Sequence, residues 1–187
     1  MTYDHTKDNI WEAVGMKEEE FEPYKDVGKK LLQDIIQYDT TSEATEVMMN
    51  FLLNPIPEKV KALILYTNVS YISLHGILGS ETIKIEESVY GFDHKADKVS
   101  KALGMDRTEV EKAIQLGKKV SKIFTREVPS KIIESVEKEV LLNDTYELKF
   151  KAIVLSGVLL AAEGYIRELD DRIEHEDDVE NSNKSDF

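Results

Sequence analysis

Two short segments of this chain bring a histidine and two aspartates together in the order Asp-His-x-x-Asp. They are Asp4, His5 and Asp8 near the N-terminus, and Asp93, His94 and Asp97 in the middle of the chain. Imidazole nitrogen and carboxylate oxygen are ligands for divalent transition metals, so the two segments could form one metal site if they met. Aspartates in a first helical turn also cap backbone amides and suit the helix dipole. We favour the capping interpretation and keep the metal site as an alternative.

A second candidate site is a polar stripe formed by Asn68, Tyr71 and His75. Their spacing of i, i+3 and i+7 places them on one face of a helix. Because histidine titrates near neutral pH, this stripe could line a ligand pocket or take part in proton transfer. Polar side chains on a packed helix more often form hydrogen bonds to neighbouring helices, which is the interpretation we favour.

The elements that must position these residues belong to a chain that repeats itself. Residues 3–54 align without a gap on residues 92–143, with 15 identical pairs in 52 positions. After one inserted residue the alignment continues, and Lys59–Leu65 matches Lys149–Leu155. Self-similarity at a nearly fixed offset is typical of an internal duplication. The sequence therefore predicts two tandem copies of one structural unit.

Each unit has the pattern of four helices, so we predict an all-α protein of about eight helices. Gly15 and Gly104 are expected to end the first helix of each copy, because glycine readily adopts the left-handed conformation there. Asp106 opens the next helix of the second copy with a spacing that resembles a capping box. In the first copy Pro23 interrupts the corresponding helix, so we expect a short turn and a main helix from Pro23 to about Tyr38.

The fourth helix of each unit is apolar around nearly its whole circumference, in residues 62–78 and 152–162. Such a helix belongs in the centre of a bundle or in a bilayer. Polar residues within the first stretch, and Glu163 after the second, favour the bundle centre over a membrane span. We predict that the two helices pack together across a pseudo-twofold axis.

Residues 99–114, with the sequence VSKALGMDRTEVEKAI, resemble the helix-turn-helix of DNA-binding regulators. The resemblance covers about 20 residues in each copy and would imply a transcription regulator whose second helix enters the major groove. A recognition helix reads base edges with Arg, Lys, Asn or Gln at its exposed start, whereas these positions hold Asp106, Arg107, Thr108, Glu109 and Glu111, so that carboxylates would face the phosphates. The net charge of −13 also opposes binding to a phosphate backbone. We therefore interpret the segment as a packing turn and do not expect a nucleic-acid partner.

Composition excludes several kinds of chemistry. The chain has no cysteine, so disulfides, thiolate metal sites and a cysteine nucleophile are ruled out. No phosphate-binding glycine loop, dinucleotide fingerprint, serine-hydrolase elbow or His-Glu-x-x-His zinc motif is present, and we expect no cofactor. The first residues show no signal-peptide pattern, so we expect a cytoplasmic location without a membrane span.

We expect residues 1–79 to form the first helical repeat, 80–91 a linker, 92–174 the second repeat and 175–187 a disordered acidic tail. Residues 168–187 contain nine acidic and two basic side chains, a composition typical of disorder. Our leading hypothesis is a non-enzymatic helical interaction or scaffold protein that binds a protein partner, or itself, near the pseudo-twofold axis. The alternatives are a helix-turn-helix-like transcription regulator, and a small-ligand binder or enzyme that uses Asn68, Tyr71 and His75.

Overall fold

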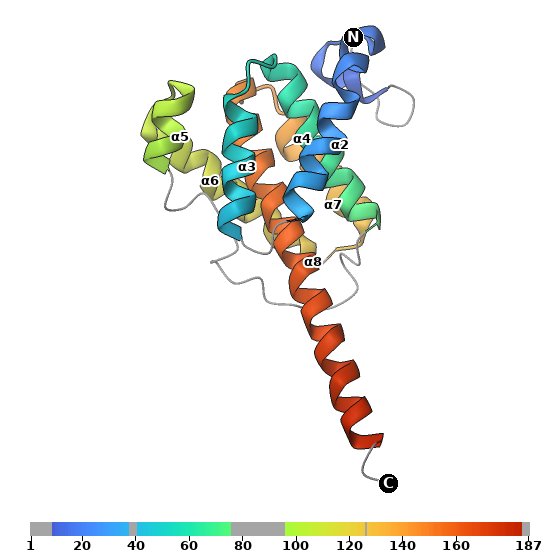
Figure 1. The fold of residues 1–187 in the computed structure, drawn as a ribbon. Helices are drawn as coiled ribbons and strands as arrows, with labels where there is room; N and C mark the ends of the chain where they lie inside the picture. The colour runs from blue at the N-terminus through green and yellow to red at the C-terminus, as the bar shows by residue number, and fades with distance from the viewer. Residues whose placement is uncertain (1–8, 38–40, 76–95, 126, 185–187) are drawn as a thin grey trace.

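The computed structural model describes residues 9–37, 41–75, 96–125 and 127–184, and it is helical throughout, with no strand among these residues. Figure 1 shows the arrangement. The predicted all-α class is confirmed. The α-helices are α1 (Glu18–Phe21), α2 (Lys25–Ile36), α3 (Thr41–Leu53), α4 (Glu58–His75), α5 (Ala96–Leu103), α6 (Arg107–Ser121), α7 (Pro129–Val136) and α8 (Leu148–Lys184). Shorter 3-10 segments are η1 (Ile10–Val14), η2 (Glu22–Tyr24) and η5 (Lys122–Thr125), and η6 (Glu137–Leu141) is π-helical.

Gly15 and Gly104 end the first helical segment of each half, as predicted. Their φ angles are 65° and 61°, and no other described residue has a positive φ. In both places the methionine that follows the glycine donates its amide to the carbonyl five residues earlier, at 3.0 and 3.1 Å. This is the longer bond of a Schellman-type helix end, which pairs a carbonyl that the helix leaves open.

We expect Gly104→Ala to lower the free energy of unfolding by about 1 kcal/mol, because an L-residue is strained at this φ. No atom lies within 4 Å of the added Cβ, so backbone strain alone should set the cost. Gly28→Ala in α2 is the matched control. Its added Cβ would meet Ile64 at an ordinary 3.5 Å, and alanine favours helix, so no loss is expected. Urea denaturation measures both, and equal effects of the two substitutions would contradict this account.

The second helix differs between the halves where the sequence predicts a difference. Pro23 lies in η2, which separates α1 from α2, whereas α6 runs without interruption over the corresponding residues. The main helix of the first half is described from Lys25 to Ile36, slightly shorter than predicted. Asp106 caps α6 by accepting a 2.8 Å hydrogen bond from the amide of Thr108, and this bond lowers the pKa of the Asp106 carboxyl. The predicted capping role of Asp106 is confirmed.

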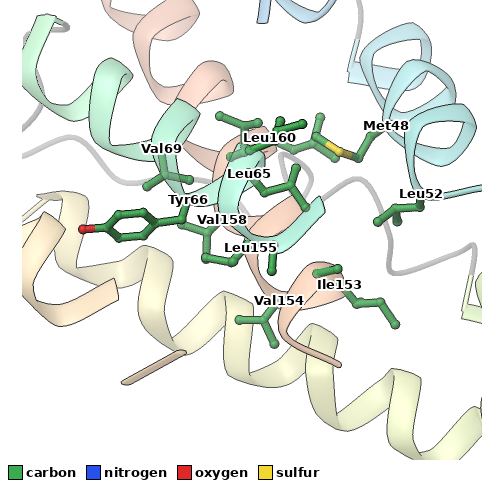
Figure 2. Packing of buried hydrophobic residues seen from close by; sticks show 14 of the residues in the cluster. Met48, Leu52, Leu65, Tyr66, Val69, Ile153, Val154, Leu155, Val158 and Leu160 are labelled. Atoms are coloured by element: carbon green, nitrogen blue, oxygen red, sulfur yellow. The ribbon is translucent and has the colours of Figure 1, made fainter. Parts of the chain in front are cut away.

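The most extensive contact between helices is that of α4 with α8, as the apolar pattern predicts. Figure 2 shows Leu65 and Val69 of α4 among aliphatic side chains of α8. The Tyr66 ring points away from this cluster, and its hydroxyl donates to Glu137 Oε2 at 2.9 Å. Fully buried hydrophobic residues of the two helices are Ala62, Leu63, Ile64, Leu65 and Val69 of α4, and Val154, Leu155, Val158, Leu159, Ala161, Ala162 and Tyr165 of α8.

The two halves contribute to one hydrophobic cluster and cross over each other within it. The third helix of the first half, α3, packs against α8 of the second half. The third helix of the second half, α7, packs against α4 of the first half. Each half therefore covers the central helix of the other, while α2 contacts α4 and α6 contacts α8.

The C-terminal region differs from the predicted disordered tail. α8 continues to Lys184, and Figure 1 shows it running past the ends of the other helices. No glycine or proline follows Gly164, and the residues there are mostly compatible with a helix, so nothing in the sequence stops it earlier.

The predicted linker 80–91 lies outside the described residues. Within the described part of the chain, no helix has the length and apolar character needed to cross a bilayer.

Candidate functional site

The predicted polar stripe of α4 divides between two environments. Asn68 is buried, and its Nδ2 donates to the carbonyl of Gly28 at 3.1 Å, which links α4 to α2. Tyr71 is 54% exposed and its ring contacts that of the exposed His75, with centroids 4.4 Å apart and planes tilted by 40°. Asn68 thus makes the interhelical hydrogen bond that we favoured, while Tyr71 and His75 lie at the surface. Neither of the two hollows described below is lined by these three residues.

The predicted metal ligands fall mostly outside the described residues, and the metal site stays a prediction. These are Asp4, His5, Asp8, Asp93 and His94. Asp97 is described, is exposed, and lies 2.9 Å from Nη1 of Arg107. In the described ranges no group of three or more histidine, aspartate and glutamate side chains is placed to hold a metal ion.

The helix-turn-helix-like segment forms a turn that packs α5 on α6. The hydroxyl of Ser100 donates to the carbonyl of Met105 at 2.7 Å and ties the end of α5 to the turn. Arg107 is the basic residue at the exposed start of α6, and it is paired with Asp97 and, at 2.8 Å, with Glu111. The remainder of α6 packs extensively on α8. These contacts are those of a packing turn, and its one N-terminal arginine is already bound by carboxylates.

A groove of about 500 Å³ lies between α6 and the first turn of α8, and we call it the α6–α8 groove. Its apolar part is formed by Met105, Leu116, Tyr146 and Phe150, and its polar part by Glu109, Lys112, Thr145 and Glu147. The rings of Tyr146 and Phe150 are stacked, with centroids 4.6 Å apart and planes inclined by 19°. All four apolar residues are only partly buried, so they are available to a partner.

Local hydrogen bonds position the wall of this groove that carries the aromatic pair. Lys149, in the first turn of α8, donates its Nζ to the carbonyl of Leu103 at 3.0 Å, which links α8 to the end of α5. The Oδ1 atom of Asn143 accepts a hydrogen bond from the backbone amide of Thr145 at 3.0 Å, within the loop before α8. The aromatic pair of the groove thus lies on a segment that hydrogen bonds tie to α5 and within its own loop.

The residues of the first half that align with the groove are buried. Phe150 aligns with Val60, which is 1% exposed, and at the same offset Tyr146 corresponds to Ile56, which is 9% exposed. Met16, the counterpart of Met105, is also buried at 9%. Smaller aliphatic residues thus occupy the core in the first half, while larger aromatic residues are left half-buried in the second.

The α6–α8 groove was not predicted from the sequence. A signal was present, because the alignment places an aromatic residue of the second half opposite an aliphatic one of the first, beside the single inserted residue. That signal shows a difference between the halves, but it does not show on which side of the helix the larger ring projects.

A second hollow of about 380 Å³ lies on the opposite edge of α6. Its lining is Ala96, Arg107, Glu111, Ile114, Gln115 and Lys118. Arg107 and Glu111 are paired with each other there, so the charged groups of this hollow already satisfy one another in part. The α6–α8 groove, with its stacked aromatic residues, is the stronger candidate.

Comparisons with protein-family models, with curated proteins and with solved structures find no match to this chain.

Proposed function

We propose that this protein is a non-enzymatic cytoplasmic interaction protein, built by tandem duplication, that binds a protein partner through the α6–α8 groove. The observation that carries this proposal is the half-buried, stacked pair of Tyr146 and Phe150 at the centre of a groove with a charged rim. Protein interfaces concentrate their binding energy in such central aromatic residues, and a polar rim excludes water around them.

The geometry of the groove favours binding over catalysis. Its charged residues, Glu109, Lys112 and Glu147, are exposed at the rim, where water solvates them, rather than buried among groups that could tune them for catalysis. The apolar residues behind them present an aromatic surface and a flexible methionine, Met105, that can adapt to a partner side chain. This is a surface suited to docking.

The duplication is supported by a matched pair of buried lysines. Lys61 donates its Nζ to the carbonyl of Leu52 at 2.6 Å. Its partner in the alignment, Lys151, donates to the carbonyl of Leu141 at 2.8 Å, and Leu141 aligns with Leu52. The same long-range hydrogen bond thus occurs at aligned positions, as do the two left-handed glycines.

Under this proposal the halves have specialised. The first half keeps aliphatic residues such as Ile56 and Val60 in the core, and Pro23 bends its second helix. In the second half that helix is uninterrupted, as α6, and Tyr146 and Phe150 lie beside it. A duplicated protein can tolerate such divergence because one copy preserves the packing while the other gains a binding surface.

Site-specific photocrosslinking tests the proposal. A benzophenone amino acid is placed at position 146, and the protein is irradiated in cells of the organism that produces it. One discrete crosslinked species is expected, and adding Leu116→Gln to the same chain should remove that species. The same amino acid at exposed Tyr71 is the matched control and should not yield that species. Circular dichroism checks that each variant is folded. An identical pattern at both positions, or a species that survives Leu116→Gln in a folded chain, would overturn the proposal.

A further inference from the structure

We propose that the occupant of the α6–α8 groove is a cationic amphipathic helix with aliphatic or aromatic anchors along one face. This inference rests on the proposed function and specifies the chemistry of the partner. It is carried by the direction of the groove along α6, by the apolar residues within it and by the charges at its rim.

The groove follows one face of α6 from Met105 to Leu116. Met105 lies just before the helix, and Glu109, Lys112 and Leu116 follow at helical spacing on the same face. At 1.5 Å per residue these positions span about 17 Å, or roughly three turns. A partner helix of similar length can lie alongside and place anchors at i, i+3 or i+4, and i+7.

The apolar lining matches large aliphatic or aromatic anchors. The stacked rings of Tyr146 and Phe150 give a rigid surface, which costs little conformational entropy on binding. Met105 and Leu116 complete the apolar lining with flexible side chains that can close around an anchor of either shape. A leucine or phenylalanine of the partner would bury its side chain here.

The rim selects for positive charge. Glu109 and Glu147 are both exposed and carry the negative charge of the rim. Lys112 is the one rim cation, and it lies near Asp106, whose pKa it helps to lower after the larger effect of the Thr108 hydrogen bond. Two glutamates against one lysine leave the rim with a net negative charge, which attracts lysines or arginines of a partner. The net charge of −13 adds a long-range attraction of the same sign.

Fluorescence anisotropy with defined synthetic helices tests the inference on the full chain. The probes are three labelled peptides of equal length: an amphipathic leucine–lysine helix, the same helix with glutamate in place of lysine, and the leucine–lysine composition in a scrambled order. The leucine–lysine helix should bind at least about tenfold more tightly than either of the others. Raising the salt concentration should weaken its binding, because the rim charges are exposed.

Variants then locate the binding site. Phe150→Ala should weaken binding of the leucine–lysine helix by about tenfold, the loss typical of a central aromatic residue. The double change Glu109→Gln and Glu147→Gln should weaken it by about threefold and flatten the salt dependence. Glu127→Gln with Glu139→Gln removes the same charge from exposed positions away from the groove and should have less than about a twofold effect.

Each result decides one part of the inference. Equal binding of the lysine and glutamate helices would overturn the charge preference, and equal binding of the scrambled peptide would overturn the helical form of the occupant. Binding that is unaffected by Phe150→Ala would place the cationic helix elsewhere and overturn the inference entirely. If the peptides fail while crosslinking at Tyr146 succeeds, the groove remains a binding site for a partner of another class. If crosslinking fails as well, the proposed function falls with it.

Discussion

Leu155→Ala in α8 is expected to lower the free energy of unfolding by about 3–4 kcal/mol. Leu155 has no exposed surface and lies in the central cluster between α8 and its neighbours, as Figure 2 shows. Removing most of its side chain loses the transfer free energy and leaves a cavity that the surrounding helices cannot fully close. Guanidinium denaturation, followed by far-ultraviolet circular dichroism, measures the change.

Leu53→Ala is the matched control for this truncation. Leu53 lies at the end of α3 and is 47% exposed, so the same chemical change should cost less than about 1 kcal/mol there. Comparable losses at Leu155 and Leu53 would contradict the assignment of the α4–α8 contact as the centre of the core.

The buried lysines are expected to give the second large effect. Lys151→Ala should lower the free energy of unfolding by about 2 kcal/mol, because the carbonyl of Leu141 would be left without its partner in a dry interior. The loss of the aliphatic part of the side chain adds to this cost. Relief from burying an ammonium group opposes it, since burial lowers the pKa of Lys151. Thermal or chemical denaturation gives the net value.

The aligned position provides an internal comparison. Lys61→Ala removes the equivalent bond to Leu52 and also an ion pair with Glu58 at 3.2 Å, so its effect should have the same sign and similar size. Lys101→Ala, at an exposed position of α5, should change stability by less than about 0.5 kcal/mol. A destabilising Lys151→Ala beside a neutral Lys61→Ala would contradict the equivalent roles of the two lysines.

The lowered pKa of Lys151 also determines how the difference in stability between the unsubstituted protein and Lys151→Met should depend on pH. Below its folded-state pKa the lysine carries its charge in both states, and the full cost of burying that charge is present. As the pH rises from that value toward the ordinary lysine value of 10.5, the folded state binds fewer protons than the unfolded state, so stability rises. The protein should therefore gain stability relative to Lys151→Met across this alkaline range.

Local signals predicted much of the helical framework. The helix ends at Gly15 and Gly104 could be predicted because the left-handed conformation of a glycine depends on only a few neighbouring residues. The capping aspartate Asp106 and the break at Pro23 are likewise local effects, and both were predicted. The apolar circumference of α4 and α8 predicted their central place, because a helix without a polar face has no other position in a bundle.

Features that depend on tertiary contacts could not be predicted in the same way. The roles of Lys61 and Lys151 join residues nine and ten positions apart across a loop, and an isolated lysine in an apolar helix gives no sign of its acceptor. The division of the polar stripe between a buried Asn68 and an exposed Tyr71 depends on where α2 crosses α4. The α6–α8 groove depends on ring orientations that no spacing rule fixes.

The crossing of α3 onto α8 and of α7 onto α4 has a consequence for the history of the chain. If both halves descend from one shorter polypeptide, that polypeptide would have buried its last helix by forming a dimer with a second copy of itself. Its survival as a folded molecule would then have depended on concentration, as for any obligate homodimer. In that case a tandem duplication would make the association of the two copies intramolecular, and one copy could change its surface while the packing between them was retained.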